Sequence, residues 1–318
     1  MNDALVRYIK IGVSVGVVTV MVLLSELLRE PEIIFPEIAA LAVGMLVSEK
    51  RAWKTTPART LVLMSFAAFA GYLIGSDQGM PVYPKVIVVF VICAAALLLT
   101  RCTMLPMISA ALLPILIPVR SIIYPLSVII FTSGIILLNR LFRKLGIAGN
   151  EKFRPIKINK KQELIHWGVL LGVLMIVAAV AVGLNIPLMI APPLVVLFVE
   201  FSYTDSPVRK SPLMIYLLTC ACAVIGSCTR LILCILLGMP LTVGVFAAAA
   251  AAICLLSVMK RLFPPAAALA VLPFIISETD VHLYPFEVMI GAGIFIAAAM
   301  LYGGVITEGK KDKNEVLL

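Results

Sequence analysis

Residues 263–273 read Phe-Pro-Pro-Ala-Ala-Ala-Leu-Ala-Val-Leu-Pro, an apolar run with proline at its start and at its end. Residues 105–114 have the same form, from Leu105-Pro106 to Pro114. As a straight helix, the apolar segment 104–118 is about 22 Å long at 1.5 Å per residue, which is short of the roughly 30 Å of a bilayer core. Proline is tolerated in the first turn of a helix, where its missing N–H costs nothing. These segments therefore predict short or broken helices that begin inside a membrane.

The composition indicates an all-α, polytopic membrane protein. Hydrophobic residues make up 62% of the 318 residues and charged residues 14%, whereas soluble domains are about half apolar and about a quarter charged. The first apolar run is too long for a signal peptide and is followed by acidic residues, so we interpret it as a span. We expect about 12 apolar segments, at 8–28, 33–48, 59–76, 86–101, 104–118, 122–142, 165–185, 188–203, 212–237, 241–259, 262–277 and 286–306.

The distribution of charge predicts the orientation of these segments. With the N-terminus inside, only Arg29, Lys85, Arg120 and Arg230 of the 26 basic residues fall outside, which leaves 22 on the inner side. This asymmetry is the positive-inside pattern, so we expect a cytoplasmic (inner) membrane location with both termini cytoplasmic. The net charge of +9 is spread over short loops and not gathered in a basic stripe, which argues against nucleic-acid binding.

The two halves of the chain match at a nearly constant offset, which indicates an internal duplication. Pro36 returns as Pro192, 156 residues later, and Tyr124-Pro125 returns as Tyr284-Pro285 at an offset of 160. Gly79-Met80-Pro81 returns as Gly238-Met239-Pro240 at 159. Six segments per copy is an even number, so the copies are expected to be parallel repeats. The predicted divisions are membrane repeat 1 at 1–145, a basic cytoplasmic linker at 146–163, membrane repeat 2 at 164–307 and a cytoplasmic tail at 308–318.

Short helices in corresponding positions of two repeats are a pointer to a transport site. A helix N-terminus carries unpaired N–H groups and a partial positive charge, which favours an anion. A carboxylate inside a membrane is a candidate proton carrier. The candidate substrate-binding residues are Pro36, Glu37, Arg101, Pro106, Ser109, Pro192, Pro193, Glu200, Lys260, Pro264 and Pro265.

Simpler interpretations of these residues remain open. The prolines can merely kink packed helices, the basic residues can be positive-inside anchors, and Glu200 can reach the interface. The glycine pairs Gly12/Gly16, Gly168/Gly172 and Gly71/Gly75 are expected to be helix-packing faces. The two histidines, His166 and His282, stand without evident partners and are assigned no role. The seven cysteines have no histidine or carboxylate at ligand spacing, so no metal or other cofactor is expected.

Three motifs of the second copy follow one another with apolar spans between them. They are Pro187-Leu188-Met189-Ile190-Ala191-Pro192, Asp205-Ser206-Pro207 and Phe263-Pro264-Pro265-Ala266-Ala267-Ala268. In this order they resemble the HPP family of integral membrane proteins, although Phe263 stands where the family has histidine. The first copy retains only Leu105-Pro106. The resemblance implies transport of a small inorganic anion such as nitrite. The fusaric-acid-resistance-like exporters are a competing resemblance, which implies export of small organic (aromatic) acids.

Together these features predict a secondary transporter or channel for a small solute. No phosphate-binding loop or soluble domain is present to support ATP-driven pumping, and no pairing of catalytic groups indicates an enzyme. A non-transporting accessory or scaffold membrane protein is the alternative. The expected partners are the lipid bilayer and a small anion or other small solute, and the sequence is compatible with a homo-oligomer.

Overall fold

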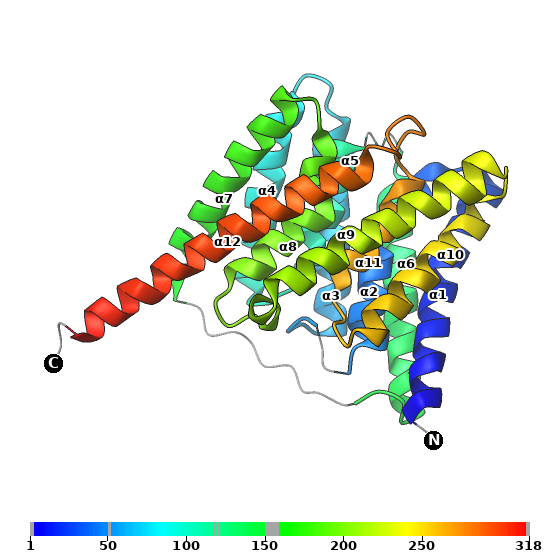
Figure 1. Ribbon diagram of the computed structural model, residues 1–318, viewed down its shortest axis with the longest axis horizontal. Coiled ribbons are helices and arrows are strands. Elements are labelled where there is room, and N and C mark those ends of the chain that lie inside the picture. The colour runs from blue at the N-terminus through cyan, green and yellow to red at the C-terminus, as the bar shows by residue number, and fades with distance from the viewer. Residues whose placement is uncertain (1–2, 50–51, 118, 120, 150–158, 316–318) are drawn as a thin grey trace.

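The computed structural model describes residues 3–49, 52–117, 119, 121–149 and 159–315, and side chains as far as residue 303. All regular structure in these residues is helical. Figure 1 shows α2, α8 and α11 in the middle of the molecule, with α1 and α10 at one side of it. Residues 150–158 of the 146–163 linker lie outside the described residues.

Within the residues that the structure describes, eight helices are long and apolar enough to cross a membrane. Large apolar side chains project from their outer faces, among them Leu99, Leu236 and Leu301. Such surfaces are expected where helices face lipid tails and not water. The protein is therefore a multi-pass membrane protein. The long helices are α1 (Asp3–Leu28), α3 (Pro57–Ser76), α4 (Val82–Thr100), α6 (Ile123–Lys144), α7 (Lys160–Gly183), α9 (Pro212–Thr229), α10 (Leu241–Val258) and α12 (Tyr284–Glu315), and α9 continues as a π-helix, η5 (Arg230–Leu236).

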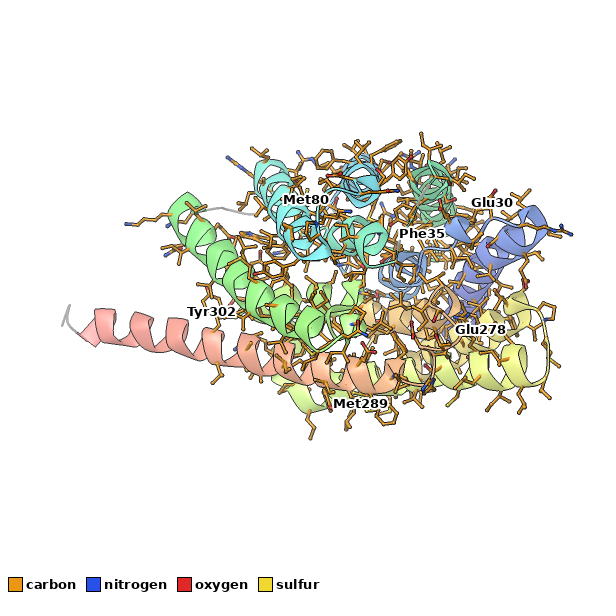
Figure 2. All side chains as sticks on the ribbon, turned by 90° about the horizontal axis from the view of Figure 1, so that it is seen from above. Glu30, Phe35, Met80, Glu278, Met289 and Tyr302 are labelled. Carbon is orange, nitrogen blue, oxygen red and sulfur yellow. The ribbon has the colours of Figure 1, made fainter. Side chains whose placement is uncertain are left out.

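Four short helices occupy the interior. They are α2 (Glu37–Ala42) with the π-helix η2 (Val43–Val47), α5 (Pro106–Leu116), α8 (Pro192–Ser202) and α11 (Pro264–Val271) with the 3-10 turn η6 (Leu272–Phe274). All residues of α2 and α11 are buried, and almost all of α5 and α8. Proline is the N-cap of α2 and lies in the first turn of the other three. Figure 2 shows Phe35, just before α2, among the helices and Glu30 at the edge of the molecule. The proline-led segments are thus short, buried helices, as expected.

The remaining 3-10 turns are η1 (Pro31–Ile33), η3 (Pro187–Ile190) and η4 (Pro207–Lys210). The first two connect α1 to α2 and α7 to α8, and the third connects α8 to α9.

The long and short helices pack in corresponding pairs. Helix α1 lies along α10, and α4 lies along α7. In the interior α2 packs against α11, and α5 packs against α8. Each pair joins one element from the first half of the chain to one from the second half, so the interior forms a single core.

The α1–α10 pair is held at both ends by hydrogen bonds. Near the start of α1, the Arg7 side chain donates to Ser257 Oγ at 2.6 Å. At the other end, the Glu26 carboxylate accepts from the backbone N–H groups of Leu241 and Thr242 at 2.6 and 3.0 Å. A carboxylate at this position stabilises the first turn of α10, whose N–H groups have no partner within the helix.

Glycines on the long helices allow a close approach to neighbouring backbone. A Cβ atom on Gly71 would collide with the carbonyl of Ala111 in α5, and one on Gly226 would collide with the carbonyl of Ala270 in α11. Gly71 and Gly75 therefore form the packing face expected for them, since Gly75 meets Pro114 in the same way.

The expectation was wrong for the other two glycine pairs within this chain. A Cβ atom on Gly12, Gly16, Gly168 or Gly172 would meet nothing within 4 Å. Gly12 and Gly168 are exposed on α1 and α7, so their spacing does not mark a contact between helices of this chain.

Candidate functional site

A cavity of about 1020 Å³ lies at the end of the molecule where α1 begins. Its wall combines the first turns of α1, the residues after η2, the η4–α9 connection and the link from α10 to α11. Elements from both halves of the chain therefore enclose it. It is lined by Ala4, Val6, Arg7, Lys10, Val47, Ser48, Glu49, Pro207, Val208, Ser211, Ile215, Ser257, Lys260, Arg261, Leu262 and Phe263.

The charged groups of this cavity are mainly positive. The basic side chains are Arg7, Lys10, Lys260 and Arg261, and the acidic one is Glu49. Two of the cations are oriented by hydroxyl groups, since Arg7 donates to Ser257 and Arg261 donates to Ser211 Oγ at 3.1 Å. A concave surface with clustered charge of one sign concentrates ions of the opposite sign. The cavity is therefore suited to an anion.

Lys10 is the most unusual of these cations, because it is 8% exposed. Its ammonium group forms no hydrogen bond or ion pair with any residue that the structure describes. Lys10 also borders a smaller cavity of about 60 Å³, together with Trp53, Thr60, Asn139 and Arg143. A buried charge is unfavourable unless a counter-charge or polar ligand compensates it. Lys10 lines both cavities, and an anion bound in either of them would compensate its charge.

His166 stands at the position in α7 that corresponds to Lys10 in α1, at the offset of 156. Its ring nitrogens lie 3.2 Å from the Tyr302 hydroxyl and 3.1 Å from Ser202 Oγ. The centroid of its ring lies 4.7 Å from that of the Tyr203 ring. His166 therefore has partners, contrary to the interpretation of it as an isolated residue, and protein groups fill its surroundings.

The six candidate prolines lie in the interior at the starts of the four short helices. They are Pro36, Pro106, Pro192, Pro193, Pro264 and Pro265, and all are buried. Backbone N–H groups in the first turns of these helices are bonded within the chain: Ile38 donates to Phe35, and Ala266 donates to Phe263. The same holds for Ile108 in α5 and Leu194 in α8. Only the helix dipoles, and not these N–H groups, remain for an anion here.

The structure brings Glu37 and Ser109 together. Glu37, the first residue of α2, is 1% exposed, and Ser109 Oγ donates to its Oε1 at 2.5 Å. Its second oxygen, Oε2, has no hydrogen-bond partner among the described residues. This carboxyl group connects α2 to the first turn of α5, deep in the core.

Three candidates remain, namely Arg101, Lys260 and Glu200. Arg101 and Lys260 are the left-handed residues that follow α4 and α10, with φ of 53° at both, and Lys260 also lines the large cavity. Glu200 lies near the end of α8, with Oε2 buried and without a hydrogen-bond partner among the described residues. Of the eleven candidates, Lys260 borders the cavity, and Glu37 and Ser109 form a pair.

Sequence reasoning missed Arg7, Lys10 and Arg261 as site residues, because it counted them only as topology signals. Lys10 carried a detectable signal, since an ionisable residue inside an apolar span is a functional candidate. Arg230 was missed in the same way. It is buried at the start of η5 and donates to the carbonyl oxygens of Pro273 and Ile276 after α11, which stabilises the end of that short helix.

Comparison of the chain with family models, with curated proteins and with solved structures found no match. The functional conclusion therefore depends on the geometry of the site.

Proposed function

We propose that this protein is a secondary transporter or channel for a small anion, with nitrite as the first candidate substrate. The supporting observation is the cavity lined by four basic side chains, of which Lys10 is buried and has no described partner. An anion in the cavity would compensate this charge. A scaffold protein needs neither the cavity nor an uncompensated lysine inside a span.

The size of the cavity indicates how the anion arrives. A water molecule occupies about 30 Å³ in the liquid, so about 1020 Å³ admits a small anion with much of its hydration shell. Selection by size therefore belongs deeper in the protein, where the short helices are packed closely. The cavity serves to concentrate anions at the basic end.

We further propose that the chain consists of two parallel six-segment repeats, twelve segments in all. In the proposed repeats, α7 corresponds to α1 and α10 corresponds to α4. Exchanging the halves therefore turns the pairing of α1 with α10 into the pairing of α7 with α4, and both pairings occur in the structure, which supports the proposal. In the described part of the chain, four non-glycine residues have positive φ, namely Arg29, Arg101, Asn185 and Lys260. Arg29 corresponds to Asn185 at an offset of 156, and Arg101 to Lys260 at 159. The relationship to the HPP family, which the sequence motifs suggest, belongs to the same proposal.

The proposed orientation places the basic end in the cytoplasm of the cell, across the inner membrane. The loops that the charge pattern assigns to the inside lie at one end of the structure. Segments 4–10, 47–49, 207–211 and 257–263 all line the cavity, and Lys54 N–H donates to Thr103 Oγ1 at 2.8 Å. The cavity is then open toward the cytoplasm.

The test is uptake by proteoliposomes that contain the purified protein. We expect saturable nitrite uptake, and Lys10→Gln should raise KM about tenfold or more, since one ionic interaction in a partly buried site contributes about 1.5–3 kcal/mol. Lys144→Gln is the matched control, because Lys144 is exposed on α6 and lines neither cavity.

Transport of benzoate but not of inorganic anions would favour the organic-acid exporter. Absence of transport of either class would support the scaffold alternative.

A further inference from the structure

The carboxyl group of Glu37 lies in surroundings that contain no described cation. Ser109 meets it from α5, and the phenol of Tyr124 approaches from α6 while donating to the Ala110 carbonyl. Helix α11, which packs on α2, presents only apolar residues and prolines. The charged side chains of α1 that the structure describes lie elsewhere: Arg7 and Lys10 line the cavity, and Glu26 accepts hydrogen bonds from the first turn of α10. A proton on Oε2 would remove the charge of this group without displacing any hydrogen bond seen in the structure.

The second half of the chain builds the corresponding place without these groups. Pro193 corresponds to Glu37 at the offset of 156, and Ala268 corresponds to Ser109 at 159. Both residues are buried in α8 and α11, and those helices form without a carboxyl or hydroxyl group at these positions. The fold therefore does not require the Glu37–Ser109 pair, and its presence in one half points to a chemical role.

Helix α2 and its continuation η2 link this carboxyl group to the cavity. Glu37 is the first residue of α2, and Val47, the last residue of η2, lines the cavity. Ten residues of helix separate them, about 15 Å at 1.5 Å per residue. Helix α11, which packs against α2, follows directly on Phe263 in the cavity wall. A shift of the two short helices would therefore act on the anion and on the carboxyl group together.

From this arrangement we propose that Glu37 is the proton-binding site of the transporter and couples the movement of one anion to one proton. The inference rests on the proposed anion transport. On the outward-facing side Glu37 accepts a proton on Oε2, the anion moves with it, and the proton is released with the anion on the other side. A monovalent anion and one proton carry no net charge. This matters because a membrane potential of 100 mV, negative inside, opposes uptake of a single negative charge by about 2.3 kcal/mol.

The experiment compares two modes of transport in proteoliposomes. In wild-type vesicles an inward proton gradient should drive nitrite accumulation, and a pH-sensitive dye inside should report protons entering with nitrite. Glu37→Gln should reduce gradient-driven accumulation at least tenfold while leaving nitrite exchange at equal pH within about twofold. Exchange survives because a permanently neutral site still allows the loaded protein to move, whereas net transport requires release of the proton.

A double variant, Glu37→Pro with Ser109→Ala, provides a second test that does not depend on tolerance of the glutamine. It installs the residue pair that the second half of the chain already accommodates, so it is expected to fold and to lose accumulation as Glu37→Gln does. Normal accumulation in either variant would overturn the proposal, as would wild-type nitrite uptake without proton movement. If the wild type neither accumulates nor exchanges any anion, the proposed transport function itself fails, which is a separate result.

Discussion

The close contact between α9 and α11 makes Gly226→Ala a stringent test of the packing of the short helices. The added Cβ would lie 2.9 Å from the carbonyl carbon of Ala270 and 3.0 Å from its Cα, and closer still to its oxygen. Ordinary van der Waals contact begins at 3.4 Å, so α11 must move by at least 0.5 Å, the difference between 3.4 and 2.9 Å. The obstructing atoms belong to the backbone and cannot rotate away. Overpacking of this kind costs about 1–3 kcal/mol.

The assay is thermal unfolding of the purified protein in detergent at one fixed scan rate, because membrane proteins often unfold irreversibly. We expect Gly226→Ala to lower Tm by several degrees, since about 1 kcal/mol corresponds to roughly 2–4 °C for a chain of 150–250 residues and to somewhat less for a longer one. Gly168→Ala is the matched control, because a Cβ there meets nothing within 4 Å and alanine favours a helix over glycine by up to about 1 kcal/mol. Equal melting temperatures for the two variants would refute the close approach of α9 and α11.

Two other predictions concern orientation and the equivalence of the halves. In a background without cysteine, Glu278→Cys should react with an impermeant thiol reagent added outside intact cells, while Lys144→Cys should react only after permeabilisation, and the reverse pattern would invert the proposed orientation. The buried phenols of Tyr124 and Tyr284 donate to carbonyl oxygens of α5 and α11 at 2.6 and 2.8 Å, so replacing either by phenylalanine should destabilise the protein by about 1 kcal/mol. Chemical denaturation of both variants checks this, and a loss confined to one of them would argue against equivalent roles.

The sequence was sufficient to predict the membrane class and the short interior helices, for simple physical reasons. A bilayer fixes the length that a span requires, and proline marks the first turn of a helix. The prolines before α5 and α11 could therefore be read directly, and both lie at the starts of short, buried helices. The length of a span and the start of a helix depend on neighbouring residues in the chain and on the surrounding solvent, and not on contacts with distant segments.

The site could be predicted only in part, because it depends on contacts between distant segments. Glu37 and Ser109 are 72 residues apart, and no local pattern shows that the serine donates to the glutamate. The cavity brings the start of α1 together with the link between α10 and α11, and its volume follows from the packing of the helices. The glycines at 12 and 16 illustrate the opposite error, since their spacing is typical of a packing face but no other helix of the chain covers them.

The two halves differ in the residues that would serve the proposed transport, and they share the residues that serve packing. Gly71 and Gly226 admit the neighbouring backbone in the same way, and Tyr124 and Tyr284 make the same hydrogen bond, so what the halves share supports packing. The chemically active groups differ: Lys10 faces a cavity where His166 is enclosed by protein groups, and the Glu37–Ser109 pair has no counterpart. Lys10 and the proposed proton-binding residue Glu37 both lie in the first half, on α1 and α2, which pack against each other. Under the proposed mechanism, the first half provides the groups that bind the anion and the proton, and the second half provides helices α10 and α11, which pack against α1 and α2.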